Sequence, residues 1–113
     1  LFDWGEEMVQ RVYNKKSFNS TDDPLIKRFL PKFFKGLQKS VKDLESATKK
    51  HDFDKISFLG HKIKGSSGIF GFPILFRIAE LIEEFAKSKD EGNVKHFIGV
   101  YSYHLERLER EHA

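Results

Sequence analysis

The sequence contains no cysteine, only three prolines and no long run of apolar residues. The lack of cysteine excludes disulfides, thiolate metal sites and cysteine nucleophiles, and it fits a reducing compartment, so we expect a cytoplasmic protein. No apolar segment approaches the roughly 18 residues that a transmembrane helix needs, and acids stand near the N-terminus where a signal peptide carries bases. We therefore expect neither membrane insertion nor export.

Charge is distributed unevenly along the chain. The net charge is +3 overall, yet residues 24–50 hold eight Lys or Arg against Asp43 and Glu45, a local net charge of +6. Such a segment is either a solvated helix face or a docking face for an acidic partner. The remainder of the chain is acidic on balance and no recognised nucleic-acid motif accompanies the basic segment, so nucleic acid is not expected as a partner.

Helical periodicity dominates the 113 residues, which suffice for a single domain, residues 1–113, with one core. We predict a short helix over 4–13 and four longer amphipathic helices over 24–49, 52–70, 73–87 and 92–110. Pro31 is expected to kink or restart the second helix. Short connections and the lack of strand-like alternation predict an all-α fold, an antiparallel up-down-up-down four-helix bundle with an additional short N-terminal helix. Because the chain begins at Leu1 rather than at Met, we expect a module trimmed from a longer protein.

Apolar residues at helical spacing indicate which faces form the core. The helix over 24–49 is predicted to bury Leu30, Phe33, Phe34, Leu37, Val41 and Leu44. The helix over 73–87 is predicted to bury Ile74, Leu75, Ile78, Leu81, Ile82 and Phe85. The helix over 92–110 is predicted to bury Val94, Phe97, Ile98, Tyr101, Leu105 and Leu108.

The segment 59–71 carries the chemistry, because a histidine and several glycines interrupt an otherwise good helix. At 100° per residue, Leu59, Ile63, Ser67 and Phe70 fall in one stripe that must face the core. His61 projects almost opposite that stripe, about 140° from Ile56. The histidine is therefore predicted to point into solvent.

The same projection places Gly65, Gly68 and Lys64 on the side of the helix that carries His61. An interior helical glycine costs about 1 kcal/mol relative to alanine, and we expect no packing conflict on this exposed face, so stability does not explain the two glycines. Close approach of a partner protein to the imidazole explains why glycine stands at these two positions. A flat patch with one nucleophile and nearby ammonium groups suits phosphoryl transfer, which depends on positioning and cations.

The run His61-Lys62-Ile63-Lys64-Gly65-Ser66-Ser67 resembles the phosphorylation motif of histidine-containing phosphotransfer (HPt) domains: histidine, any residue, an aliphatic residue, Lys or Arg, Gly and two small residues. The flanking helices are similar to that family over most of the chain, although only the motif is specific. The resemblance implies a phosphorelay intermediate in which His61 accepts a phosphoryl group from the phospho-aspartate of a receiver domain and donates it to another receiver.

The resemblance also assigns roles around His61. Lys62 and Lys64 would neutralise the phosphoryl group, and Gly65 would let the receiver close on the imidazole. The docking surface is expected to comprise Gly65, Gly68, Ser57 and Phe58. The partners would be receiver domains of response regulators or of a hybrid histidine kinase, which supply the Mg²⁺, so that a monomeric module needs no metal or cofactor of its own. No ATP-binding segment is present, and no autonomous kinase activity is expected.

Two other functions are compatible with a helical bundle. A non-catalytic interaction bundle with an incidental exposed histidine would need none of the motif's chemistry. A metal-carboxylate bundle needs two Glu-x-x-His motifs, and Glu109 and His112 form one copy without a second. Of the remaining histidines, His51 stands at a helix boundary, and His96 and His104 on the last helix have neither a ligand-spaced partner nor an adjacent nucleophile. All three are expected to be surface or partly packed histidines.

Overall fold

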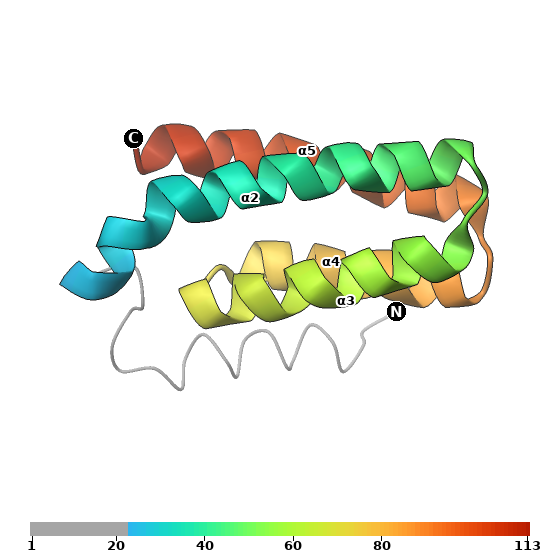
Figure 1. Ribbon diagram of the computed structural model, residues 1–113, viewed down its shortest axis with the longest axis horizontal. Coiled ribbons are helices and arrows are strands. Elements are labelled where there is room, and N and C mark those ends of the chain that lie inside the picture. Colours follow the sequence, from blue (N-terminus) through green and yellow to red (C-terminus); the bar gives the residue numbers. More distant parts are fainter. Residues whose placement is uncertain (1–22) are drawn as a thin grey trace.

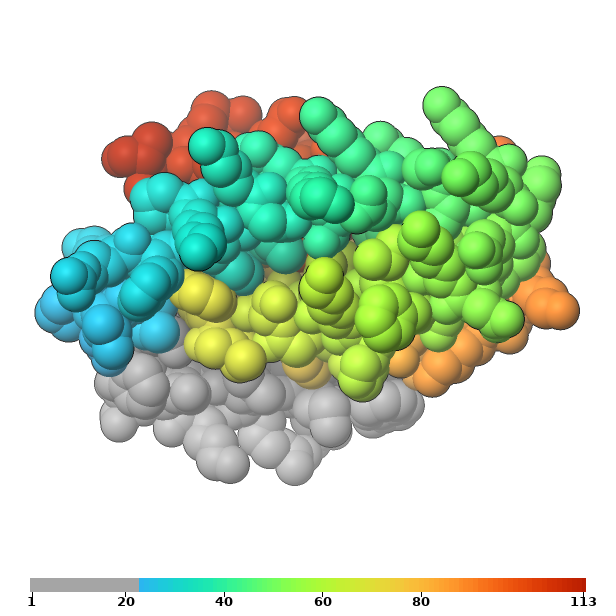
Figure 2. All heavy atoms as spheres, viewed as in Figure 1, coloured from blue at the N-terminus to red at the C-terminus, as the bar shows by residue number. Residues whose placement is uncertain are grey.

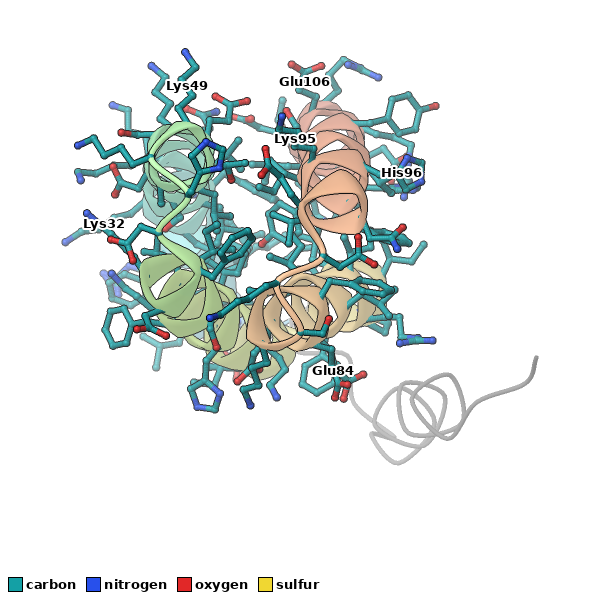
Figure 3. All side chains as sticks on the ribbon, turned by 90° about the vertical axis from the view of Figure 1, so that its right-hand side faces the viewer. Lys32, Lys49, Glu84, Lys95, His96 and Glu106 are labelled. Atoms are coloured by element: carbon teal, nitrogen blue, oxygen red, sulfur yellow. The ribbon has the colours of Figure 1, made fainter. Side chains whose placement is uncertain are left out.

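The protein is built from long helices around one core. The computed structural model describes residues 23–113, in which the helices are α2 (Pro24–Lys49), α3 (Phe53–Phe70), α4 (Pro73–Lys87) and α5 (Glu91–Glu111). The helix expected over 4–13 lies outside the described residues. Helices α2 and α4 each pack against both α3 and α5, so the four surround a common interior, and the predicted four-helix bundle is confirmed (Figures 1 and 3). None of the described helices is long and apolar enough to cross a membrane.

The connections between the helices are short. A residue with left-handed backbone geometry follows each of the first three helices, and a side chain caps the start of α3 and of α5. His51, Lys89 and Gly71 end α2, α4 and α3 with left-handed φ values of 56°, 58° and 81°. Asp52 and Asp90 then cap α3 and α5 by accepting hydrogen bonds from backbone N–H groups of the first turn. Consecutive helices consequently run antiparallel with hardly any loop between them (Figure 1).

Helix α2 starts where Asp23 and Pro24 predict. The Asp23 carboxylate accepts a hydrogen bond from the backbone N–H of Leu25 at 2.8 Å, and Pro24 occupies the first helical position. The helix continues through Pro31, so it does not restart there. Its first turns bend away from the axis of the remainder (Figure 1), as expected where a proline removes a backbone hydrogen bond.

The core confirms most of the predicted apolar faces. All six residues predicted for α2 are buried. The prediction for α4 is wrong at Ile74, which is 42% exposed, and Leu81 and Phe85 are only half-buried. Small residues take their place, because Ala79 and Ala86 lie where α4 packs closely against its neighbours. Close packing of α4 brings one of its edges, including Glu83, against α3.

A buried polar contact crosses the core between α3 and α5. Ser67 Oγ donates to the carbonyl of Ile63 at 2.7 Å, and the fully buried Tyr101 hydroxyl lies 3.3 Å from the same Ser67 oxygen. Burial raises the pKa of Tyr101 and outweighs the hydrogen bond with Ser67, so the phenol stays protonated. Because the Ser67 hydroxyl already donates to Ile63, the Tyr101 hydroxyl donates to Ser67. The second small residue of the 61–67 motif is therefore a core residue that fixes α3 relative to α5.

Candidate functional site

His61 lies in the middle of α3 and points away from the core. Its side chain is 69% exposed, whereas Ile56, Leu59 and Ile63 of the same helix are buried. The helical projection therefore gives the right orientation for the imidazole. An exposed imidazole on a rigid helix is accessible to a second protein without any opening of the bundle.

The imidazole of His61 is held by a buried acid on the neighbouring helix. Its Nδ1 lies 3.1 Å from Oε2 of Glu83 on α4, and the Glu83 side chain is only 10% exposed. Two lysines reach the same carboxylate: Lys64 Nζ lies 3.1 Å from Oε1, and Lys87 Nζ lies 3.4 Å from Oε2. One carboxylate thus gathers a histidine and two cations from α3 and α4.

The charge state of Glu83 determines the tautomer of His61. Burial works against ionisation of Glu83, but hydrogen bonds and charges from Lys64 and Lys87 outweigh it, so the pKa of Glu83 is lowered. An ionised carboxylate can only accept hydrogen bonds, which assigns the imidazole proton to Nδ1. The Nε2 atom of His61 then carries the free lone pair of the neutral ring.

Gly60 permits the close approach of α3 to α4 that this contact requires. A Cβ atom at position 60 would lie 3.1 Å from the backbone N and 3.2 Å from the Cα of Glu83. Backbone atoms cannot move aside as the end of a flexible side chain can, so any larger residue would push the two helices apart. The glycine that precedes the histidine therefore sets the distance between His61 and Glu83.

The two lysines of the motif have different surroundings. Lys64 is only 24% exposed and is already paired with Glu83, one turn from the imidazole. Lys62 is exposed, and no ion pair involves it among residues 23–113. Lys64 is therefore the motif lysine that the structure brings to the His61–Glu83 pair.

The four residues predicted for docking do not form one uniform surface. A Cβ added to Gly65 would meet nothing within 4 Å, and Phe58 is 68% exposed. Ser57 is half-buried. The expectation that Gly68 also tolerates a larger side chain is wrong, because a Cβ there would lie 3.2 Å from the Phe76 ring on α4. Gly65 and Phe58 are the open positions beside the histidine, and Gly68 serves the packing of α3 on α4.

Sequence reasoning missed Glu83. In the sequence it stands four residues before Lys87, a spacing that is typical of an exposed ion pair on a helix surface. Its separation of 22 residues from His61 gives no indication of contact. The available signal was Gly60, since a glycine inside a helix often marks the close approach of another backbone.

The other histidines contact neighbours unrelated to His61. His112 caps α5 by hydrogen bonding to the Leu108 carbonyl at 2.8 Å and packs edge-on against Phe72. Glu109 is the partner of His112 in the Glu-x-x-His spacing. Its two carboxylate oxygens accept hydrogen bonds from the side-chain amide of Gln38 at 2.6 and 2.7 Å. Over residues 23–113 there is no group of three or more His, Cys, Asp or Glu side chains that could hold a metal ion.

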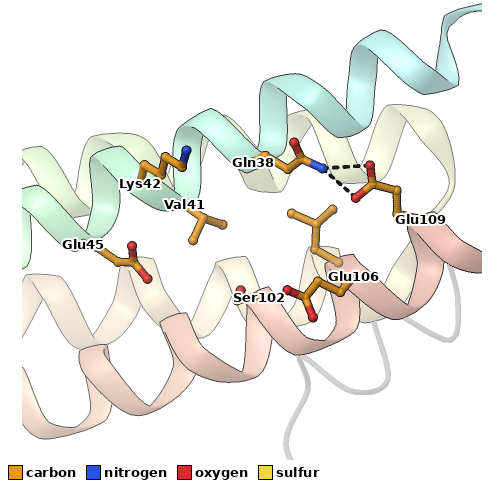
Figure 4. Close-up of a pocket in the computed structure, with 8 residues that line it drawn as sticks. Gln38, Val41, Lys42, Glu45, Ser102, Glu106 and Glu109 are labelled. Carbon is orange, nitrogen blue, oxygen red and sulfur yellow. Dashed lines mark hydrogen bonds between the residues drawn. The ribbon is translucent and has the colours of Figure 1, made fainter.

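A pocket of about 270 Å³ lies between α2 and α5, beside the Gln38–Glu109 contact (Figure 4). Its walls carry side chains of both signs, including Lys42 and Glu106. None of its lining residues belongs to α3 or α4. The pocket is therefore separate from the cluster around His61.

Comparison with known proteins assigns most of the chain to a family. The sequence profile of the Hpt domain matches residues 28–111. Among curated proteins, "Multistep phosphorelay regulator 1" of Schizosaccharomyces pombe (strain 972) is 29% identical over 62 residues, which cover 55% of this chain and 21% of that protein. The chain thus spans about a fifth of the length of this curated relative. No solved structure matches the chain.

Proposed function

The chain belongs to the Hpt domain family, and we propose that it is a phosphorelay intermediate in which His61 carries the phosphoryl group between aspartates of receiver domains. The observation that carries the proposal is the contact between Glu83 and Nδ1 of an otherwise exposed His61. It leaves Nε2 as a nucleophile that is oriented toward solvent by a fixed partner. The S. pombe relative is named as a phosphorelay regulator, which supports the same function.

The proposed reaction needs no proton transfer. The Nε2 lone pair attacks phosphorus in line with the bond to the aspartate oxygen of the receiver; the Nε2–P bond forms as the P–O bond breaks, and the aspartate leaves as a carboxylate. The product is a phosphoimidazolium that retains its proton on Nδ1. Its positive charge is stabilised by the Glu83 carboxylate at 3.1 Å. Reversal of the same steps returns the phosphoryl group to a receiver.

Lysines would balance the charge of the transferred group. Lys64 lies one turn from His61 and is bound to Glu83, so it can move its ammonium toward the phosphoryl oxygens without leaving the cluster. Lys87, 66% exposed and also paired with Glu83, is a second cation at the same carboxylate. We include Lys62 as an exposed cation on the same helix. Mg²⁺ is expected on the receiver rather than on this module.

The docking surface of the proposed function is centred on Gly65. Its open position lets a receiver approach the helix backbone one turn from the imidazole, and the exposed ring of Phe58 offers an apolar contact on the other side of His61. Ser57 and Gly68 lie at the edge of this surface. A receiver is the partner that fits, because its phospho-aspartate must come within bonding distance of Nε2.

The test is transfer from a phosphorylated receiver domain to the purified chain. Label on the protein should be acid-labile and base-stable, as a phosphoimidazole is, and His61→Gln should abolish it without loss of helical content. His96→Gln, an exposed histidine on α5, is the matched control and should be labelled normally. Labelling that persists in His61→Gln would reject His61 as the acceptor, and a chain that no receiver labels would favour the non-catalytic interaction bundle.

A further inference from the structure

The outer face of α2 carries a continuous band of cations. Arg28, Lys32, Lys35, Lys39, Lys42 and Lys49 are all exposed and follow one another three, four or seven residues apart. At 100° per residue they fall within a strip about 100° wide, and at 1.5 Å per residue the row is about 30 Å long. We call these six residues the basic stripe. Figure 3 shows Lys32 and Lys49 projecting from the outer side of α2.

The basic stripe is not a product of helix stabilisation. Helices α4 and α5 pair cations with acids four residues away, as in Glu83–Lys87, Glu91–Lys95 and Arg107–Glu111. Among residues 23–113 the stripe has one ion pair, Lys39–Asp43 at 3.2 Å. From Arg28 to Lys42 each successive pair of stripe residues stands at i,i+3 or i,i+4 spacing with like charges, which destabilise a helix, whereas Glu45 stands three residues after Lys42 and four before Lys49. Like charges therefore persist along α2 at a cost to its stability.

The excess charge is confined to this helix. Residues 24–50 carry +6 while the whole chain carries +3, so the rest of the chain carries −3. The excess positive charge of the protein therefore lies along one edge of the bundle. Such a distribution orients the molecule toward a polyanionic surface rather than attracting anions to it from all sides.

The composition of the stripe distinguishes between polyanions. Protein interfaces are enriched in Arg, whose planar group binds carboxylates with two hydrogen bonds, and are depleted in Lys. Five of the six stripe residues are Lys, which acts as a hydrated point charge suited to a field of lipid phosphates. Lys42 and Lys49 each border a pocket between α2 and α5, but Glu45 lines both of these pockets and would repel an acidic peptide.

Apolar side chains at one end of the same helix favour a bilayer over nucleic acid. Leu25 is 56% exposed and Phe29 is 49% exposed, and both lie in the first turns of α2 beside the stripe. Exposed Leu and Phe side chains bury apolar area when they enter the boundary between lipid headgroups and acyl chains. The phosphate backbone of a nucleic acid offers them no such apolar contact. Figure 2 shows the face of the molecule on which α2 and α3 lie side by side, with α2 along its upper half.

We propose that the basic stripe of α2 binds the surface of an anionic phospholipid bilayer, with Leu25 and Phe29 in contact with the headgroup region. Binding through α2 leaves the proposed reaction site accessible. His61 is held by Glu83 of α4, and α4 packs against α3 and α5 across the bundle from α2. A module bound in this way presents the face formed by α3 and α4 away from the bilayer.

The test is sedimentation of the full chain with vesicles of phosphatidylcholine, with and without phosphatidylserine, at physiological ionic strength. The chain should bind only the vesicles that contain phosphatidylserine. Each surface Lys contributes about a fivefold change in affinity, so Lys35→Gln combined with Lys42→Gln should weaken binding by about 25-fold. Lys89→Gln combined with Arg110→Gln removes the same charge elsewhere and should have little effect.

Several results would overturn the proposal. They are no binding to anionic vesicles, equal losses in the two double variants, or tighter binding to a short DNA duplex than to vesicles. Phe29→Ser separates lipid from nucleic acid, because it should weaken binding to vesicles and leave binding to a duplex unchanged. His61→Gln should bind vesicles like the unmodified chain, so failure here is distinguishable from failure of the phosphorelay function.

Discussion

Oε2 of Glu83 lies 3.1 Å from Nδ1 of His61, although the two residues are 22 positions apart and on different helices. The Glu83 carboxylate is buried and the His61 imidazole is exposed, so a side chain held by the packed bundle orients the side chain that reacts. Glu83 does not touch the phosphoryl group in the proposed reaction. It acts through His61, and we class it as a positioning residue.

Replacement of Glu83 by Gln tests this relationship. Glu83→Gln keeps the size of the side chain but loses the charge that fixes the Nδ1 proton and stabilises the phosphoimidazolium. A charged hydrogen bond contributes about 1.5 kcal/mol or more, so the maximal rate of transfer from a phosphorylated receiver should fall about tenfold or more. Apparent receiver affinity should not change, because Glu83 is buried. Glu84→Gln, on the exposed side of α4, is the control, and an unchanged maximal rate in Glu83→Gln would contradict the positioning role.

The stability of the fold should depend on the ionisation of Glu83. Its pKa lies below the usual value of 4.5 because its contacts with Lys64 and Lys87 outweigh the opposing effect of burial. The unfolded chain therefore binds the proton first as the pH falls. The stabilisation from Glu83 is fully present above about pH 5 and is lost as the pH drops through the lower folded value. Denaturant unfolding at pH 7 and pH 3 should show a smaller loss of stability for Glu83→Gln than for the unmodified chain, and equal losses would reject this assignment.

Gly65 should show opposite effects on stability and transfer. Its Cβ position is open, so Gly65→Ala should stabilise the fold by up to about 1 kcal/mol. If a receiver approaches here, transfer should fall from Gly to Ala to Leu. Gly99→Ala on α5 is matched, since its Cβ position is equally open, and it should stabilise without slowing transfer. Melting curves beside transfer time courses measure both effects, and normal transfer by Gly65→Leu would show that docking occurs elsewhere.

Gly60 should respond in the opposite sense to Gly65. Gly60→Ala places a methyl group 3.1–3.3 Å from the backbone and Cβ of Glu83, and overpacking of this kind costs about 1–3 kcal/mol against a helix-propensity gain of about 1 kcal/mol. We expect a net destabilisation of up to about 2 kcal/mol and slower transfer, because α4 and Glu83 must shift relative to His61. Denaturant unfolding measures the first effect. Stabilisation by Gly60→Ala would mean that α3 and α4 are less tightly packed than described.

Lys64 should matter more for transfer than a lysine on another helix. Its Nζ lies 3.1 Å from Glu83 beside the imidazole, whereas Lys39 is paired with Asp43 on the outer side of α2. Lys64→Ala should slow transfer several-fold, since it removes a cation beside the developing phosphoryl charge. Lys39→Ala should leave the rate unchanged. Equal rates for the two variants would show that the cation is not local to the chemistry.

Local sequence information determined the helices and the direction of His61. Asp23, Asp52 and Asp90 stand at helix starts because their carboxylates satisfy free backbone N–H groups, a contact made within three residues. The period of 3.6 residues separates the buried side of α3 from the side that bears the histidine. These features depend on neighbours in the chain, so they can be derived without knowing the fold.

Tertiary structure alone decided what His61 touches. Periodicity shows which face of a helix is inward, but it does not show which residue of the adjacent helix lies opposite a given position. The sequence alone assigns Glu83 to an exposed ion pair with Lys87 and Gly68 to open solvent. In the structure, α4 packs on α3, which places the Glu83 carboxylate beside His61 and the Phe76 ring beside Gly68. That register depends on how closely the two helices approach at Gly60, and this distance is set by contacts between residues distant in the sequence.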